Sequence, residues 1–274
     1  MKTKFLHIAT ALLFVGFTSS CSDFLDRYPL DELSDSSFWK TENDAMMAVT
    51  DIYGCLPTWD QDEDINSDNA VHGIKWAAGN ISKGIYDPMD QSWAGSYTPI
   101  RQCNLVLEKV KDIEMSDESR KKIEGQAYFF RAFVYFNLIR SFGDVPYIDK
   151  PLNLTDVEDI TRTPREEVYA KVMADFDKAI EYLPEEWDAA NTPRVTKGAA
   201  LAMKARAALY YSNWQVAADA SKAVIDLGKY ELYDAGNTGK YQELFWEKSD
   251  GCDENILYVQ FNYPDKTHYL IGWE

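Results

Sequence analysis

The chain has 274 residues and a net charge of −17, with 46% apolar and 14% aromatic residues. This length supports one substantial hydrophobic core or two small ones, and the apolar content is high enough to build it. The acidic excess opposes binding to nucleic acid, whose recognition depends on Lys and Arg contacts to phosphate. Neutral ligands such as carbohydrates are compatible with this charge.

The first segment, 1–20, is typical of a secretory signal. Lys2 and Lys4 precede an apolar run, and small residues lead into Cys21. The apolar run would reach only about 20 Å as a helix, which is too short to span a bilayer core of about 30 Å. A cysteine at the first mature position predicts that its thiol is lipidated. The alternative is an ordinary secretory signal, because Thr18 stands where lipoprotein signals usually have Leu.

Three cysteines would remain after cleavage and modification, Cys55, Cys103 and Cys252, which is enough for one disulfide and one free thiol. Their spacing is not that of a metal site. Only His72 and His268 follow the signal, so a histidine-based metal centre or triad is not expected. The sequence therefore predicts no metal and no cofactor.

Residues 22–40 lack periodicity and are expected to form a surface tether. Thr41 then starts a helix as its N-cap, with Asp44 at the third helical position. Residues 55–96 form a long irregular stretch rich in Asp, Asn, Gly and Trp. Such stretches in a compact domain are usually functional or disordered, and tryptophans argue against disorder.

From Tyr97 onward the pattern predicts one helix after another. The expected helices cover about 97–114, 117–142, 163–183, 196–211 and 214–227. The second is apolar on nearly all sides, which predicts a central, buried helix. Thr163 is expected to cap the third, with Glu166 reaching back to its backbone N–H. The alternation over 254–261 predicts a strand.

The helix pairs match tetratricopeptide units, which are helix–turn–helix repeats that must stack to bury their apolar faces. The residues at packing positions are Phe176, Ala179, Leu201, Ala205, Ala208, Trp214 and Ala217. The predicted fold is therefore all-α, a tetratricopeptide-like helical repeat scaffold with long irregular loops and a short strand near the C-terminus. The alternative is any helical hairpin packed through alanines.

A series of motifs then follows along the mature chain, clearest in the GQAYFFRA segment at 125–132. The others lie at 21–30, 36–42, 101–104, 135–136, 143–146, 163–169 and 196–200. With these motifs the chain resembles the SusD/RagB family, the outer-membrane nutrient-binding lipoproteins of Bacteroidetes.

The resemblance implies a lipid anchor at Cys21 in the outer membrane, exposure at the cell surface, and binding of glycans or sometimes peptides without catalysis. It implies a partner, a TonB-dependent transporter of the SusC type, over which the protein sits as a lid. Family members are considerably longer and carry a large C-terminal portion, so the resemblance also implies that this chain is a truncated N-terminal portion whose helical domain is incomplete at the C-terminus. The expected organisation is a signal over 1–20, a tether over 21–40 and a SusD-like helical domain over 41–274.

Ligand binding is expected in the 55–96 stretch, because flat aromatic faces stack on sugar C–H surfaces while amides and carboxylates bind the hydroxyls. Trp76 and Trp93 are the candidate platforms. The candidate hydroxyl ligands are Asp68, Asn69 and Asn80. The alternative is that these tryptophans pin a long loop to the helices.

The acidic run at 60–64 opens like a calcium loop, but Ile65 replaces the turn glycine and Val71 the final glutamate, so a solvated acidic loop is expected. The chain has no nucleophile elbow, phosphate-binding glycine loop or zinc pair, and is not expected to be an enzyme. Two alternatives remain beside the glycan-binding lipoprotein. One is a helical-repeat adaptor that contacts only protein, and the less favoured one is a glycoside hydrolase with two catalytic carboxylates.

Overall fold

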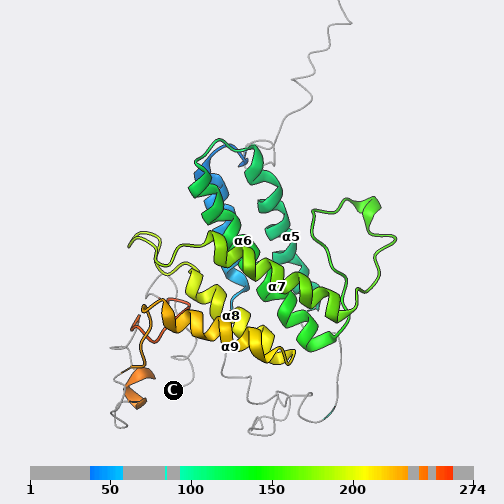
Figure 1. The fold of residues 1–274 in the computed structure, drawn as a ribbon. Coiled ribbons are helices and arrows are strands. Elements are labelled where there is room, and N and C mark those ends of the chain that lie inside the picture. The colour runs from blue at the N-terminus through cyan, green and yellow to red at the C-terminus, as the bar shows by residue number, and fades with distance from the viewer. Residues whose placement is uncertain (1–37, 58–83, 85–92, 234–240, 246–250, 262–274) are drawn as a thin grey trace, which may run out of the picture. The chain divides into compact units, whose positions relative to one another are not determined.

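The structure is a computed structural model that describes residues 38–57, 84, 93–233, 241–245 and 251–261. Six α-helices form the fold of these residues (Figure 1). They are α4 (Glu42–Ile52), α5 (Trp93–Lys109), α6 (Asp117–Phe142), α7 (Arg165–Tyr182), α8 (Lys197–Tyr210) and α9 (Trp214–Asp226). Short 3-10 turns accompany them, η1 (Tyr53–Cys55), η5 (Val110–Asp112), η6 (Leu154–Asp156) and η7 (Tyr241–Phe245). Contacts between residues group the chain into two compact units, 1–40 and 41–274.

Local signals set the ends of several helices. Thr41 caps α4 in a capping box, in which the Asp44 N–H donates to Thr41 Oγ1 (3.2 Å) and the Thr41 N–H donates to Asp44 Oδ2 (2.8 Å). Thr196 caps α8 by accepting from the Ala199 N–H (3.2 Å). Gly143 ends α6 at φ 71°, a conformation that glycine adopts without steric cost. The predicted bounds of α6 are confirmed.

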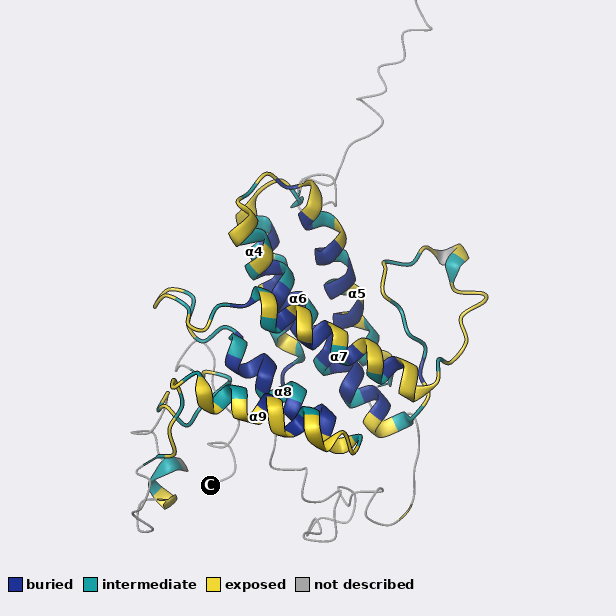
Figure 2. Ribbon diagram, in the orientation of Figure 1, coloured by how far each residue is buried: buried dark blue, intermediate teal, exposed yellow. Residues whose placement is uncertain are grey.

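Helix α6 is the centre of the fold. Thirteen of its 26 residues are buried, and it packs on α4, α5, α7 and α8. Figure 2 shows the buried faces of the surrounding helices turned toward it. Helices that follow one another in the chain, from α5 to α9, pack side by side as stacked hairpins. Helices α8 and α9 pack together, and Ala205 and Ala208 on α8 and Ala217 and Ala220 on α9 are buried. The predicted repeat scaffold is confirmed.

A buried ion pair joins α6 to α7. The Arg131 guanidinium donates from Nε to Asp175 Oδ2 and from Nη2 to Asp175 Oδ1, both at 2.7 Å. Its Nη1 donates to Asn104 Oδ1 on α5 (2.8 Å), and the Asn104 amide donates to the carbonyl of Ile148 (2.9 Å). The Arg131 guanidinium thus links α5, α6 and α7, and Asn104 extends this link to the segment that follows α6.

Thr163 does not cap α7 as expected. The helix begins at Arg165, and the N–H of Arg165 donates to Asp144 Oδ1 (2.9 Å). Thr163 pairs with Val145 in an antiparallel bridge, in which each backbone N–H donates to the other's carbonyl (2.9 and 3.2 Å). The prediction was wrong because the capping box needs the Thr163 N–H, and Val145 already accepts from it.

Two further expectations are corrected. Residues 254–261 form no strand, and the described part of the chain offers no neighbouring strand to pair with their backbone groups. The sequence predicts Trp214 at a packing position, but the structure leaves its side chain 63% exposed on α9. Cys55, Cys103 and Cys252 are free thiols in the structure. Burial raises the pKa of Cys55 to about 12, so this thiol stays protonated at neutral pH.

Replacing Asp175 by Ala is expected to lower the free energy of unfolding by about 3–5 kcal/mol, because it leaves the Arg131 charge buried without a counterion. Urea denaturation followed by circular dichroism measures the loss. The control is Asp226→Ala, which removes the exposed pair between Lys222 and Asp226 on α9 and should cost at most about 1 kcal/mol. Equal losses in the two variants would contradict the role given to the buried pair.

Candidate functional site

The structure describes one of the predicted ligand residues, Trp93. The others lie outside the described residues, namely Trp76, Asp68, Asn69 and Asn80, as do the lipidation candidate Cys21 and the acidic run at 60–64. Their assignments remain predictions.

Trp93 is the first residue of α5 and is half-buried. The edge of its ring meets Phe142 at the end of α6, with ring centroids 4.8 Å apart and an interplanar angle of 84°. The Arg162 guanidinium lies over the ring, 5.2 Å from its centroid, at a cation–π distance. These contacts connect the start of α5 to the end of α6. This agrees with the alternative in which the tryptophan anchors the long loop to the helices. A second role as a sugar platform stays a prediction.

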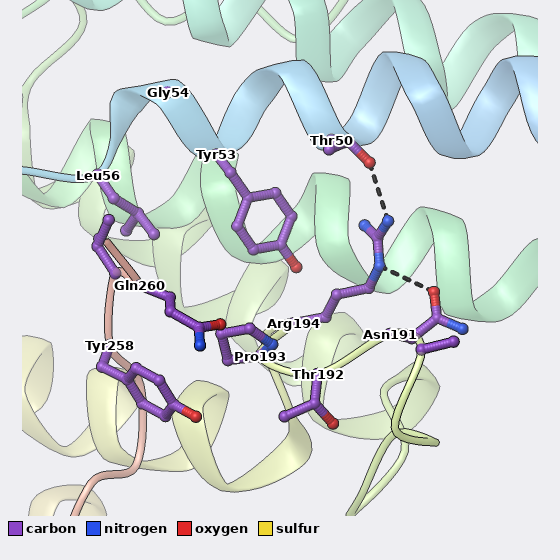
Figure 3. Close-up of a pocket in the computed structure, with 12 residues that line it drawn as sticks. Thr50, Tyr53, Gly54, Leu56, Asn191, Thr192, Pro193, Arg194, Tyr258 and Gln260 are labelled. Carbon is purple, nitrogen blue, oxygen red and sulfur yellow. Dashed lines mark hydrogen bonds between the residues drawn. The ribbon is translucent and has the colours of Figure 1, made fainter. Parts of the chain in front are cut away.

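A pocket of about 370 Å³ lies elsewhere in the same unit (Figure 3). Its walls come from three segments far apart in the sequence. The lining residues are Thr50, Tyr53, Gly54 and Leu56 at the end of α4 and η1, residues 190–194 before α8, and residues 258–260. Sequence reasoning missed this pocket, because no local pattern shows that these segments meet.

The back of this pocket is a hydrogen-bonded cluster around Tyr53. Its hydroxyl donates to Gln126 Oε1 on α6 (2.8 Å) and accepts from the Val195 N–H (2.9 Å). Burial raises the pKa of the Tyr53 phenol, against the opposing effect of the Val195 and Arg194 contacts. The Tyr53 hydroxyl is therefore neutral, and its proton is committed to Gln126.

Arg194 stands between this cluster and the pocket. Its Nη2 donates to Thr50 Oγ1 (2.9 Å), its Nη1 to Gln126 Oε1 (3.2 Å) and its Nε to Asn191 Oδ1 (3.2 Å). The Asn191 side chain is itself fixed, since its amide donates to both carboxylate oxygens of Asp188 (3.0 and 3.1 Å). The guanidinium is thus held in one place by α4, α6 and the loop before α8.

The sequence of this chain matches a known protein family. A family model described as "SusD-like_3: Starch-binding associating with outer membrane" matches residues 24–209. The chain belongs to the SusD-like family. A SusD-like protein of Formosa agariphila is 30% identical over 276 residues, covering 95% of this chain and 53% of its relative. A SusD-like protein of Bacteroides ovatus is 25% identical, covering 95% and 50%.

Solved structures agree with this SusD-like assignment. A SusD-like protein from Bacteroides fragilis superposes with a TM-score of 0.75 at 28% identity, covering 87% of this chain and 48% of the other. A laminarin-binding SusD-like protein gives a TM-score of 0.71 at 23% identity, covering 81% and 52%. Surface glycan-binding protein A from Bacteroides fluxus gives 0.66 at 22%, covering 80% and 50%. The chain spans about half the length of the curated relatives it matches.

The described part of this SusD-like chain has no helix with the length and apolarity needed to cross a membrane. Within the same residues no group of three or more His, Cys, Asp or Glu side chains is placed to hold a metal ion. The described parts of the candidate sites offer aromatic rings, amides, hydroxyls and the guanidinium groups of Arg162 and Arg194, which are groups suited to binding a polar organic ligand.

Changing Tyr53 to Phe should lower the free energy of unfolding by about 1–3 kcal/mol, because the buried Val195 N–H loses its acceptor and the Gln126 oxygen loses one of its two donors. The matched control is Tyr210→Phe, since that tyrosine is 57% exposed and its hydroxyl makes no hydrogen bond to another described residue. The control should change stability by less than about 0.5 kcal/mol. Identical urea denaturation curves for the two variants would show that the hydrogen bonds of Tyr53 do not stabilise the fold.

Proposed function

We propose that this protein is a cell-surface lipoprotein that binds a nutrient glycan and delivers it to a SusC-type TonB-dependent transporter in the outer membrane. The observation that carries the proposal is membership of a family described by starch binding and outer-membrane association. The names of two structural neighbours, one laminarin-binding and one a surface glycan-binding protein, support a glycan ligand. Binding takes place without catalysis.

The proposed glycan contacts are the platforms Trp76 and Trp93, with Asp68, Asn69 and Asn80 binding sugar hydroxyls. Trp93 is compatible with this role because Phe142 meets it edge-on, and an anchored ring is already ordered before the ligand arrives. Because Trp93 also packs against Phe142, replacing it is expected to lower the stability of the fold, so the Trp93 variant needs a stability control.

Trp76→Ala and Trp93→Ala should each abolish or strongly reduce retention in native gels that contain the cognate glycan, because each removes a stacking face. Laminarin and starch are the first probes. Trp214→Ala is the matched control, because Trp214 is an exposed tryptophan on α9 outside the 55–96 stretch. Thermal melts show whether each variant is folded. Unchanged retention of a folded Trp76→Ala protein would reject this placement of the site, and a protein that retains no glycan would favour the protein-binding adaptor.

Cys21 is the proposed attachment point of the lipid. Cys21→Ser should move the protein from the membrane fraction to the soluble fraction and abolish incorporation of labelled palmitate, because two or more acyl chains are what hold such a protein on a membrane. Cys252→Ser is the control, since that residue is a free thiol of the folded unit. Membrane attachment that survives Cys21→Ser would refute the anchor.

A further inference from the structure

The pocket between α4, the 190–194 loop and residues 258–260 is unusual in its charge. The chain as a whole has a net charge of −17, yet none of the twelve residues that line this pocket is acidic. Arg194 is the one charged residue among them. A ligand entering the pocket therefore meets a positive charge on a protein whose overall charge would repel anions.

The Arg194 charge has no carboxylate partner among the described residues. Its three hydrogen bonds go to neutral oxygens, those of Thr50, Gln126 and Asn191. A guanidinium has five N–H donors, so one N–H remains on each terminal nitrogen. Some cations among the described residues have an acidic neighbour, as Lys222 has in Asp226. Arg194 has no such neighbour in the same part of the chain. It is half-buried and held by three neutral oxygens, with its guanidinium 5.8 Å from the centroid of the Tyr53 ring, so its charge is available to an anion.

The remaining walls suit a sugar ring. Tyr53, Leu56 and Pro193 give an apolar side against which C–H groups can pack. The Tyr258 hydroxyl and the Gln260 amide make no hydrogen bond to any other described residue, and both lie on the 258–260 wall in Figure 3. The volume of about 370 Å³ is at the lower end of the range of about 300–1,000 Å³ for small-molecule pockets.

We propose that this pocket is a second binding site, which takes the carboxylate of an acidic sugar such as a uronate residue of a glycan. The carboxylate accepts from the two free N–H groups of Arg194, while Gln260 and Tyr258 bind the ring hydroxyls. This inference rests on the proposed function and names a substrate class for it. The fork of a guanidinium matches two carboxylate oxygens, which a lysine cannot reproduce.

Isothermal titration with tetragalacturonate tests the site, with the carboxyl-reduced tetrasaccharide as the neutral probe. The protein should bind tetragalacturonate at least tenfold more tightly than the reduced form, and less tightly as salt rises. Arg194→Gln should weaken tetragalacturonate binding at least tenfold, and Arg194→Lys should restore only part of it. Gln260→Glu should weaken tetragalacturonate binding several-fold by like-charge repulsion, and should weaken it more than it weakens binding of the neutral probe.

Two matched controls separate the site from overall charge. Arg206→Gln removes an exposed cation on α8, and Gln242→Glu adds an acid at an exposed position in η7, both away from the pocket. Neither should change binding. Because Arg194 also supports the fold, thermal melts accompany its variants. The exposed Gln260 has no hydrogen bond in the described structure, so its variant tests the pocket without that complication.

Several results would overturn the inference. They are wild-type affinity in Arg194→Gln, an equal loss in Arg206→Gln, equal binding of the reduced tetrasaccharide, or equal binding of tetraglutamate, which would assign the pocket to acidic peptides. Retention of laminarin without any binding of tetragalacturonate would end this inference and leave the proposed function standing. A folded protein that binds no glycan of either kind would refute both.

Discussion

The ion pair between Arg131 and Asp175 is the interaction on which the rest of this structure depends. Both side chains are under 10% exposed, and removing two such charges from water costs several kcal/mol for each ion. Burial raises the pKa of the Asp175 carboxyl, and the paired hydrogen bonds from Arg131 oppose that shift. The pair persists because its geometry is bidentate and because Asn104 engages the remaining terminal nitrogen. It therefore fixes how α5, α6 and α7 are placed relative to one another.

A second polar cluster does the same at the other side of α6. Gln126 accepts from both Tyr53 and Arg194 and donates to the Lys122 carbonyl, so one amide links η1, α6 and the loop before α8. A buried amide that lost these partners would cost about 1–3 kcal/mol. The two clusters explain why polar residues occur within a helix that is otherwise apolar on nearly all sides.

Much of this fold could be predicted from the sequence, because the signals that decide it are local. Thr41 with Asp44 specifies a helix start, Gly143 specifies a stop, and the apolar content of 117–142 specifies burial. The partners of the buried polar groups could not be predicted in the same way. Arg131 and Asp175 are 44 residues apart, and either could have been an exposed charge on an amphipathic helix.

The wrong predictions have the same origin. Thr163 carries a good capping pattern, but its backbone had already paired with Val145, a contact that only the folded chain reveals. The start of α5 lies at Trp93, four residues before the predicted start, because Trp93 packs against Phe142 and extends the helix into a stretch without local periodicity. The pocket escaped prediction entirely, since its walls come from three distant segments.

Helix α6 also sets the distance between the two candidate sites. Phe142 at its end supports Trp93, and Gln126 in its first half supports Arg194. Sixteen residues of helix at about 1.5 Å each separate these supports by about 24 Å. One sugar residue cannot reach across that span, so the sites act independently on a small ligand. A ligand that contacts both has to be an extended oligosaccharide, and the rigidity of α6 then fixes the spacing at which its acidic and stacking units are bound.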